Sequence, residues 1–337
     1  MQLNKKALFR LDSGAQFGLG HVMRSKSLAD ALLSLQIECT FACRYLHSAA
    51  AISGHQLMMI ADEDEFLALA KAYDVIIIDH YDYYSELFFS LSQLENTVLV
   101  ILDDECNRGQ LYADVIINPS LHASALDYKH MAADACLLLG LEYSLLRAIF
   151  TRESPLAFEQ RESIVITLGG SDVTALTLPL LNAMLNINSI LMSYKVVVVT
   201  GKGCAEQQKI AEFCQQRGLC HYHDVKNMAV LFCSAIFAIS AAGSTAFELA
   251  YCGVPAVFAV VADNQLLSMR KLSQADWCEM VDCRKQNQPE LILTKAQAML
   301  SDLPQLERAS QKARTLIDGQ GAERIALLLS KKITAAQ

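Results

Sequence analysis

The sequence has no excess of positive charge, and this absence sets the first limit on its partners. Its 28 lysine and arginine residues are outnumbered by 36 aspartate and glutamate residues, so the formal net charge is −8 at pH 7. Proteins that bind nucleic acid usually carry a basic patch or stripe. We therefore expect no nucleic-acid partner, and we expect any nucleotide ligand to be held by local amides and dipoles.

An export signal and a long uninterrupted apolar run are also missing. Residues 1–6 lack the apolar core of a signal peptide. The most hydrophobic region, residues 234–262, is interrupted by Gly243, Glu248, Gly253 and Pro255, which is not the pattern of a membrane span. We interpret it as strand, turn, helix, turn and strand, and we expect a cytoplasmic protein without membrane contact.

Zinc-site spacing is absent as well. The chain has 11 cysteines but no Cys-x-x-Cys, and the pairs Cys39/Cys43 and Cys278/Cys283 lack further ligands nearby. Without an export signal, the pattern favours free thiols in a reducing cytosol. We expect no bound metal and no cofactor.

Several catalytic motifs are missing. There is no Gly-x-Ser-x-Gly, no His-Glu-x-x-His and no kinase signature, which disfavours serine hydrolase, zinc protease and kinase chemistry. A glycine-rich turn does occur, but Met23 occupies the third glycine position of the dinucleotide fingerprint and no Gly-Lys-Ser/Thr follows.

What the chain does have is a regular alternation of apolar strands with helical patterns over 337 residues, 53% of them hydrophobic. Continuous apolar runs such as 75–79 and 97–102 are typical of parallel strands covered on both faces. A polar stretch at 150–162 resembles a linker, and a second alternation follows it. We therefore predict an α/β protein with two Rossmann-like domains, residues 1–150 and 151–337, with parallel sheets that face a cleft.

Polar residues gather where the predicted strands end, and ligands of open α/β sheets bind at these ends. The first segment runs from Asp12 through Gly14, Gly18 and Gly20 to His21, where a helical pattern begins. Glycines let the backbone approach a ligand, and an imidazole there is placed for proton transfer beside an anion. The alternative is an ordinary turn in which His21 caps the helix.

A second candidate anion site lies at 241–248. Gly243, Ser244 and Thr245 open a helix whose amides and hydroxyls can hold a diphosphate. Glu248 follows about one turn later and can accept hydrogen bonds from ribose hydroxyls. The alternative is a capped helix with a solvent-facing glutamate.

Acidic residues end two predicted strands of the first domain. Asp79, His80 and Tyr81 follow one strand, and we weigh a helix cap for Asp79 against a phenol presented to a ligand by Tyr81. Asp103 and Asp104 follow the next, and we favour loop ordering over Mg²⁺ binding.

Two further motifs lie in the second half. His221-x-His223 places two imidazoles on one face of a strand, and we favour exposed edge histidines over a metal site. Asp263-Asn264-Gln265 can bind a sugar, cap the following helix, or do both.

Taken in order, these motifs resemble the GT-B superfamily, and within it the UDP-sugar hydrolases of pseudaminic acid biosynthesis. The resemblance runs from residue 10 to about residue 270. It rests on Arg10-x-Asp12, Gly18-x-Gly20-His21, Arg24, Asp79-His80-Tyr81, Leu102-Asp103-Asp104, Asn118-Pro119, Gly140-x-x-Tyr143-x-x-Leu146-Arg147, Gly169-Gly170-Ser171-Asp172, Gly243-Ser244-Thr245-x-x-Glu248, Gly253-x-Pro255 and Asp263-Asn264-Gln265.

The resemblance implies a GT-B fold and an enzyme that cleaves UDP from a UDP-2,4-diacetamido-2,4,6-trideoxyhexose, a reaction linked to flagellin glycosylation. The sequence leaves the oligomeric state open, and we expect a monomer. It implies His21 as the catalytic base, supported by Tyr81 and Asn264. Its substrate-binding positions are Asp12, Gly18, Gly20, Gly170, Gly243, Ser244, Thr245, Glu248 and Gln265.

One position departs from the family pattern, because Ala242 stands where many relatives have a glycine. Two other functions stay open on the sequence alone. One is a GT-B glycosyltransferase that uses a UDP-sugar donor, and the other is a non-catalytic nucleotide-sugar binding protein.

Overall fold

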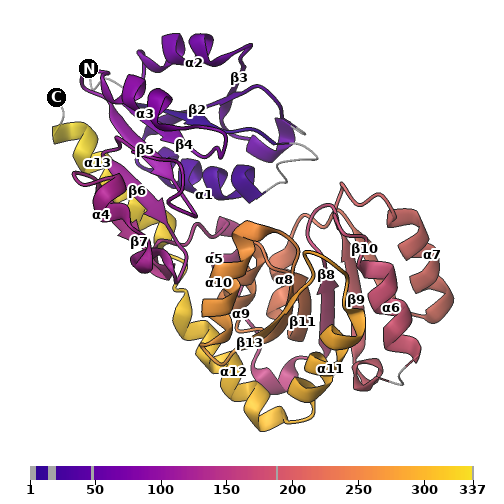
Figure 1. Cartoon of the computed structure of the whole chain (residues 1–337). Coiled ribbons are helices and arrows are strands. Elements are labelled where there is room, and N and C mark those ends of the chain that lie inside the picture. The colour runs from indigo at the N-terminus through magenta and orange to yellow at the C-terminus, as the bar shows by residue number, and fades with distance from the viewer. Residues whose placement is uncertain (1–4, 14–19, 47–48, 187–188, 336–337) are drawn as a thin grey trace. The chain divides into compact units, whose positions relative to one another are not determined.

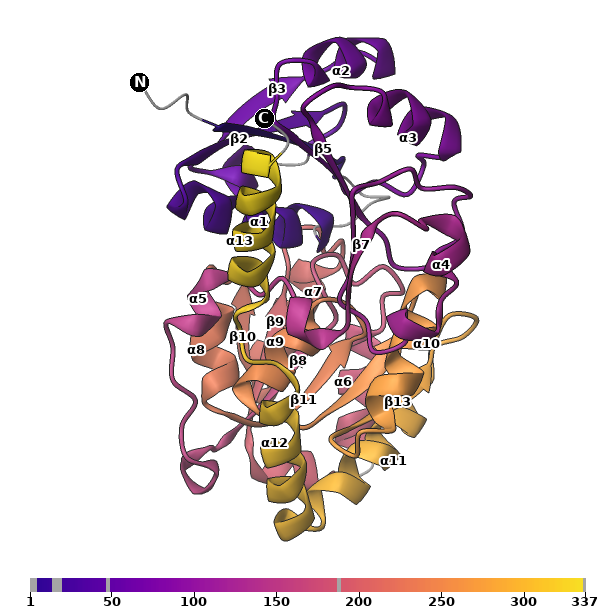
Figure 2. The same cartoon turned by 90° about the vertical axis from the view of Figure 1, so that its left-hand side faces the viewer.

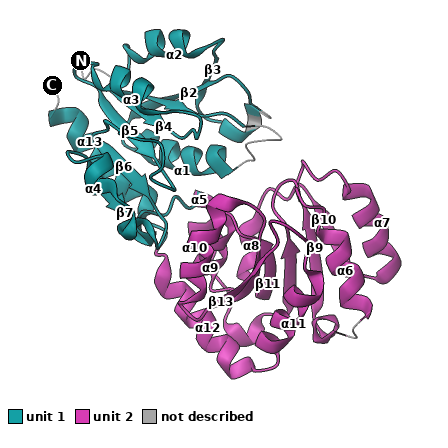
Figure 3. Cartoon of the chain, in the orientation of Figure 1, with its two compact units in different colours: residues 1–147, 319–337 teal, residues 148–318 magenta. Residues whose placement is uncertain are grey.

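The computed structural model describes residues 5–13, 20–46, 49–186 and 189–335. The chain forms two compact units, which are coloured separately in Figure 3. Unit 1 comprises Met1–Arg147 and Gly319–Gln337, and unit 2 comprises Ala148–Asp318. Each unit is an α/β domain built on one sheet (Figure 1).

Unit 1 contains a seven-stranded sheet in the order β3-β2-β1-β4-β5-β6-β7. All of its strand pairs are parallel, and the order of the first six is the Rossmann order. The strands are β1 Lys5–Arg10, β2 Ile37–Cys43, β3 Gln56–Met59, β4 Val75–Ile78, β5 Val98–Leu102, β6 Val115–Asn118 and β7 Cys136–Leu139.

Helices cover both faces of this sheet because successive side chains of a strand point to opposite faces. Ala7, Phe9 and Leu11 pack with α1 and α13, whereas Leu8 packs with α2, α3 and α4. The helices are α1 Gly20–Ser34, α2 Glu63–Ala70, α3 Ser85–Ser92, α4 Tyr128–Met131 and α13 Gly321–Ala335, with short 3-10 helices η1 Ala49–Ile52, η2 Ala123–Ala125 and η3 Leu141–Tyr143.

Unit 2 repeats this plan with a six-stranded sheet in the order β10-β9-β8-β11-β12-β13. These strand pairs are also parallel. The strands are β8 Ser163–Thr167, β9 Lys195–Thr200, β10 Cys220–His223, β11 Ala235–Ala241, β12 Ala256–Val260 and β13 Cys278–Asp282.

Most helices of unit 2 lie in the connections between its parallel strands. Helices α6, α7 and α11 contribute to one large core, in which Ile164, Ile166 and Ile239 of the sheet are buried. The helices are α5 Ala148–Thr151, α6 Thr177–Asn186, α7 Gln207–Arg217, α8 Met228–Cys233, α9 Thr245–Cys252, α10 Asp263–Ser273, α11 Pro289–Leu300 and α12 Leu303–Leu316, with 3-10 helices η4 Phe158–Gln160 and η5 Ile190–Ser193.

The predicted α/β class and the parallel sheets are confirmed, and every predicted strand has a counterpart within a few residues. Strands β7 and β13 and helices α4, α5, α7 and α8 were not predicted. The cleft expected between the two domains stays a prediction. Among the described residues, no helix is both long enough and apolar enough to cross a bilayer.

The predicted division between residues 150 and 151 lies three residues from the observed one, between Arg147 and Ala148, but the prediction for the end of the chain is wrong. The final helix α13 belongs to unit 1 and lies beside α1 (Figure 2). Its Ile325 and Leu329 belong to the same core as Val22 and Leu28 of α1. Residues 150–162 are not a free linker. Phe150 is buried and stacks on Phe232 at 5.9 Å, so this stretch is part of the fold of unit 2.

The C-terminal end of α9 depends on a glycine. Gly253 has φ +64°, and a Cβ there would lie 2.5 Å from Arg314 Cγ and 3.1 Å from Ser310 O of α12. Gly218 ends α7 with a similar φ of +67°, but a Cβ there would meet nothing within 4 Å. Substitutions at these two glycines therefore distinguish the cost of backbone strain from the cost of a steric clash.

We predict that Gly218→Ala lowers the free energy of unfolding by about 1 kcal/mol, the cost of a left-handed alanine. Gly253→Ala should cost at least about 1 kcal/mol more, because its methyl group also overpacks the α9–α12 contact. Urea unfolding followed by circular dichroism measures both. Equal costs for the two variants would contradict the packing argument.

Candidate functional site

The polar strand ends of unit 1 meet where the strand order reverses. Strand β1 pairs with β2 on one side and with β4 on the other, and such a switch point is where open α/β sheets bind ligands. Asp12 follows β1, and Asp79, His80 and Tyr81 follow β4. Helix α1, which carries His21, begins close to the same edge.

The Asp79 carboxylate is the centre of this edge. It is 1% exposed and lies 2.5 Å from His21 Nδ1. Arg24 donates to both of its oxygens, at 2.5 Å from Nη2 and 2.8 Å from Nε, and Ser25 Oγ donates at 3.0 Å. Helical spacing explains the convergence, since His21, Arg24 and Ser25 share one face of α1.

The partner fixes the tautomer of His21. An ionised carboxylate only accepts hydrogen bonds, so Nδ1 carries the proton and donates to Asp79. Arg24 Nη2 also lies 3.3 Å from Nδ1, but a guanidinium cannot accept that proton and the carboxylate lies nearer. The neutral ring therefore keeps its lone pair on Nε2, the nitrogen available as a base.

Arg24 links this pair to a second carboxylate. Its Nη1 donates to both oxygens of Asp104 at 3.0 and 2.9 Å, and Tyr81 Oη donates to Asp104 Oδ2 at 2.5 Å. The Tyr81 ring meets His21 edge-on, with a centroid distance of 4.6 Å. Tyr81 and His21 are thus brought together as predicted, through a network that includes Arg24 and Asp104.

The pKa shifts follow from burial and charge. Burial alone would raise the pKa of Asp79, but the charges and hydrogen bonds of Arg24 and His21 outweigh it and hold this pKa well below its usual range. The same competition, with Arg24 and Tyr81 as partners, lowers the pKa of Asp104. Burial and the Asp104 charge raise the pKa of Tyr81, so its phenol stays protonated.

The Asp12 carboxylate accepts hydrogen bonds from other groups of the protein. Its Oδ1 accepts from the backbone N–H of Arg44 and Tyr45 at 2.7 and 3.0 Å, and its Oδ2 accepts from Arg10 and His80 at 3.1 and 3.0 Å. A carboxylate has about four acceptor positions. The structure thus favours a positioning role for Asp12 over the predicted ligand contact.

The glycine loop can be judged only at its end. Gly18 lies outside the described residues, as do the other residues of 14–19. Gly20 is the first residue of α1, and a Cβ there would meet nothing within 4 Å. Its predicted ligand contact stays a prediction.

The remaining acidic predictions in unit 1 are also resolved. Asp79 does not cap the next helix, since α3 has Tyr84 as its N-cap residue. Asp103 accepts from Arg108, Cys106 N and Tyr128 Oη, which is the favoured loop-ordering role. Asp103 and Asp104 therefore have different partners and do not form a shared Mg²⁺ site.

The strand ends of unit 2 also lie side by side. Strands β8, β11 and β12 are neighbours, and the order reverses at β8. The turn after β8 contains Gly170, whose carbonyl accepts from Gly203 N at 2.9 Å. A Cβ on Gly201 would lie 2.4 Å from Gly170 O. The turn after β9 therefore needs glycine at this position to approach the turn after β8 so closely.

Helix α9 begins at the end of β11, as predicted. Ser244 is its N-cap residue and makes no side-chain cap bond. The N–H groups of Ala246 and Phe247 bond to the carbonyls of Gly243 and Ser244, so those of Ser244 and Thr245 are the ones that the start of the helix can offer to an anion. Gly243 and Ser244 are exposed and Thr245 is half-buried. Glu248 is 8% exposed, which excludes the solvent-facing alternative. Ala242 is buried with its N–H bonded to Ala259 O at 2.9 Å, so its methyl group is accommodated.

The third predicted motif of unit 2 opens α10. Asn264 is exposed, and Gln265 Oε1 accepts from Val261 N at 3.0 Å, so Gln265 ties the helix start to the end of β12. His221 and His223 lie on the edge strand β10, as expected, and both approach Thr200 Oγ1, at 2.9 and 3.2 Å.

Sequence reasoning missed how the candidate base is held. Asp79 and Arg24 were noted within motifs, but the pairing of Asp79 with His21 and Arg24 was not predicted, and neither was the part of Ser25. A usable signal existed: a carboxylate ending a buried strand, and the i, i+3, i+4 spacing of polar residues on α1.

Comparisons with known proteins place this geometry in context. Residues 164–325 match the family described as glycosyltransferase family 28 C-terminal domain. The chain is 27% identical over 226 residues to the UDP-2,4-diacetamido-2,4,6-trideoxy-beta-L-altropyranose hydrolase of Campylobacter jejuni, covering 62% of this chain and 74% of that protein. It is 28% identical over 258 residues to the pseudaminic acid cytidylyltransferase and UDP-2,4-diacetamido-2,4,6-trideoxy-beta-L-altropyranose hydrolase of Helicobacter pylori, covering 75% of this chain and 44% of that longer protein.

Solved structures agree on the fold. MurG of Acinetobacter baumannii superposes with a TM-score of 0.63 at 15% identity, covering 97% of this chain and 99% of MurG. The S. aureus MnaA–UDP co-structure gives a TM-score of 0.64 at 12% identity, covering 98% and 97%. The predicted GT-B fold is confirmed.

The lowered pKa of Asp79 gives a pH prediction with a definite sign. A carboxyl group whose pKa is lower in the folded state adds stability above its unfolded pKa of about 3.9, and this stability is lost as the pH falls through and below that value. We predict that Asp79→Asn lowers the free energy of unfolding by about 3 kcal/mol at pH 7. Below pH 4 the gap between the variant and the wild type should narrow progressively as the pH falls toward the lowered pKa of Asp79.

Urea unfolding between pH 7 and pH 2.5 measures both proteins. Asp127→Asn is the matched control, because Asp127 forms a largely exposed pair with His130 and should change stability by less than about 1 kcal/mol. A constant gap between wild type and Asp79→Asn across this range would contradict the prediction.

Proposed function

From the premise that the chain is a GT-B protein related to the UDP-2,4-diacetamido-2,4,6-trideoxy-beta-L-altropyranose hydrolases, we propose that it hydrolyses a UDP-2,4-diacetamido-2,4,6-trideoxyhexose. Water attacks the anomeric carbon of the sugar, and UDP leaves. The observation that carries the proposal is the His21–Asp79 pair, because it combines a positioned base with the residues of the hydrolase motif.

In the proposed reaction His21 is the general base. Asp79 accepts a hydrogen bond from Nδ1–H at 2.5 Å, so Nε2 takes a proton from water as the water oxygen bonds to C1. The imidazolium that forms is stabilised by the ionised Asp79 carboxylate, whose lowered pKa keeps it charged. One direct displacement inverts the configuration at C1.

In the same proposal unit 2 stabilises the leaving group. The C1–O bond breaks, and its electron pair stays on the UDP oxygen. The amides of Ser244 and Thr245 at the start of α9 meet the growing negative charge, with Gly170 and Gly243 allowing close approach. The buried Glu248 accepts hydrogen bonds from the ribose hydroxyls. Because amides and a helix dipole carry the charge, we propose that no metal is needed.

Tyr81 and Asn264 complete the proposed assignments as groups that orient the water or the acetamido substituents. Tyr81 is already oriented by Asp104 and by its edge contact with His21. Its raised pKa keeps the phenol protonated in the neutral range, and because that proton is donated to Asp104, its oxygen is proposed to act as an acceptor. Gln265 is proposed to act near the sugar while it ties α10 to β12.

A glycosyltransferase is the second candidate, and the match of residues 164–325 to a glycosyltransferase family favours it. In that reaction an acceptor hydroxyl would replace water. The two functions differ in one measurable way, because only a hydrolase releases UDP at full rate when no acceptor is present.

The proposed function is tested by turnover of UDP-2,4-diacetamido-2,4,6-trideoxyhexoses in H₂¹⁸O with EDTA and no acceptor. We predict that ¹⁸O appears on C1 of the free sugar and not in UDP, and that the first product seen by NMR has the inverted anomeric configuration. ¹⁸O in UDP, or no turnover without an acceptor, would contradict hydrolysis at C1.

The same assay tests the base. We expect His21→Ala to reduce turnover by about 10²–10⁴-fold, the usual contribution of a general base, and to leave UDP affinity within about twofold. His130→Ala is the matched control, since His130 is an exposed histidine of the same unit. Wild-type turnover by His21→Ala would remove His21 from this role.

A further inference from the structure

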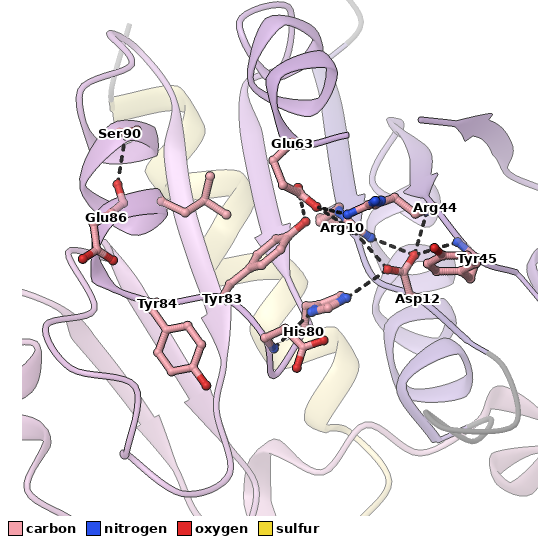
Figure 4. A pocket seen from close by; sticks show the side chains of 12 residues that line it. Arg10, Asp12, Arg44, Tyr45, Glu63, His80, Tyr83, Tyr84, Glu86 and Ser90 are labelled. Carbon is pink, nitrogen blue, oxygen red and sulfur yellow. Dashed lines mark hydrogen bonds and ion pairs between the residues drawn. The ribbon is translucent and has the colours of Figure 1, made fainter. Parts of the chain in front are cut away.

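Unit 1 contains a pocket that none of the assigned catalytic side chains lines. Its volume is about 540 Å³, within the range of small-molecule sites. Figure 4 shows it at the ends of β1 and β4, beside α2 and α3. His21, Arg24 and Tyr81 are not among its lining residues. Asp79 and His80 are consecutive, and only His80 reaches this pocket.

The floor of the pocket is a fixed polar network. Arg10 donates to Asp12 and Glu63, each at 3.1 Å, and Tyr83 Oη donates to Glu63. The Tyr83 ring stacks on His80, with a centroid distance of 4.6 Å. These contacts hold the floor in one arrangement before any ligand binds, which lowers the entropy cost of binding.

The floor histidine is neutral in this network. His80 Nδ1 accepts from the backbone N–H of Asp82 at 3.2 Å, so Nε2 carries the proton and donates to Asp12 at 3.0 Å. The charged groups of the floor are therefore the Arg10 guanidinium and the carboxylates of Asp12 and Glu63, and Arg10 forms an ion pair with each carboxylate.

The rim of the pocket adds aromatic rings and further acidic groups. Tyr45 and Tyr84 are 59% and 55% exposed. Arg44 lies 3.7 Å from Glu63, and Asp82 and Glu86 are exposed on the other side. Figure 4 shows the Tyr84 ring and the Glu86 carboxylate on the side of α3.

This composition narrows the class of ligand. Four carboxylates line the pocket against two guanidinium groups, which disfavours an anion such as a phosphate or a nucleotide. Leu87 is the one aliphatic side chain among the lining residues, which disfavours a lipid. Paired carboxylates, guanidinium groups and hydroxyls offer acceptors and donors together, as vicinal hydroxyl groups require. Exposed tyrosine rings offer flat faces to the C–H face of a sugar ring.

We propose that this pocket binds a nucleotide-free saccharide at a site separate from that of the reaction. The paired floor fixes the shape of the pocket, the rim groups Arg44, Asp82 and Glu86 exchange hydrogen bonds with the hydroxyl groups, and Tyr84 packs against the ring. Because the ligand is uncharged, binding depends little on ionic strength. The proposal goes beyond hydrolysis of the UDP-sugar and does not depend on it.

The test is a titration of the full chain with N-acetyl-D-glucosamine, N-acetyl-D-mannosamine and methyl α-D-mannoside, followed by saturation-transfer NMR. We expect at least one of them to bind, with Tyr84→Ala weakening the dissociation constant by about tenfold. Phe89→Ala is the matched control: it removes an exposed ring of α3 that lies outside the pocket, and it should leave binding unchanged.

Two further arms separate the alternatives. His21→Ala should bind the saccharide as tightly as the wild type, and saturating UDP should not displace it, so this site and the proposed reaction can fail independently. Glu86→Gln and 0.5 M salt should change the affinity less than twofold. The proposal would be overturned if none of the three sugars binds, if UDP displaces the sugar, or if His21→Ala loses sugar binding. It would also be overturned if spermidine or inorganic phosphate binds in place of the sugars in a salt-sensitive way.

Discussion

One buried negative charge organises the functional edge of unit 1. The Asp79 carboxylate is almost fully excluded from water, and such a charge is costly unless it is paired and hydrogen-bonded. Helix α1 meets this need with three side chains of one face, and Arg24 extends the network to Asp104 and Tyr81. The same contacts that stabilise the charge also decide which imidazole nitrogen of His21 can accept a proton.

The topology makes this arrangement possible. Both sheets follow the Rossmann order, and in each the order of the strands across the sheet reverses at the first strand. The loops after neighbouring strands therefore end at one edge, where the backbone also offers the start of a helix. In unit 1 titratable side chains lie at this edge of the sheet. In unit 2 the same edge has glycines, the start of α9 and the buried Glu248.

Much of the fold could be predicted because both sheets are buried on two faces. Continuous apolar runs such as Val75–Ile78 leave few alternatives to a central parallel strand. The missed strand β7 is short and half-buried, and β13 carries Glu279 and Asp282, so neither has that signature. The assignment of α13 to unit 1 was not readable either, because an amphipathic helix shows its apolar face but not the sheet on which it packs.

The candidate site was predictable in its positions and less so in its contacts. Strand ends identified His21, Tyr81 and the start of α9, but sequence spacing cannot show that Asp79 points toward α1 while His80 points to the opposite side. Asp12 illustrates the limit. Its place beside the glycine loop suggested a ligand contact, and the structure fills its oxygens with the backbone of Arg44 and Tyr45 and with two side chains.

Asp79 orients the His21 ring so that the imidazole carries its proton on Nδ1 and its lone pair on Nε2. Long-range ¹H–¹⁵N NMR of the protein labelled with ¹⁵N-histidine, with His21→Ala for assignment, measures this directly at a pH where the ring is neutral. We predict a protonated Nδ1 signal and an unprotonated Nε2 signal for His21. A proton on Nε2, or rapid averaging between both nitrogens, would contradict it.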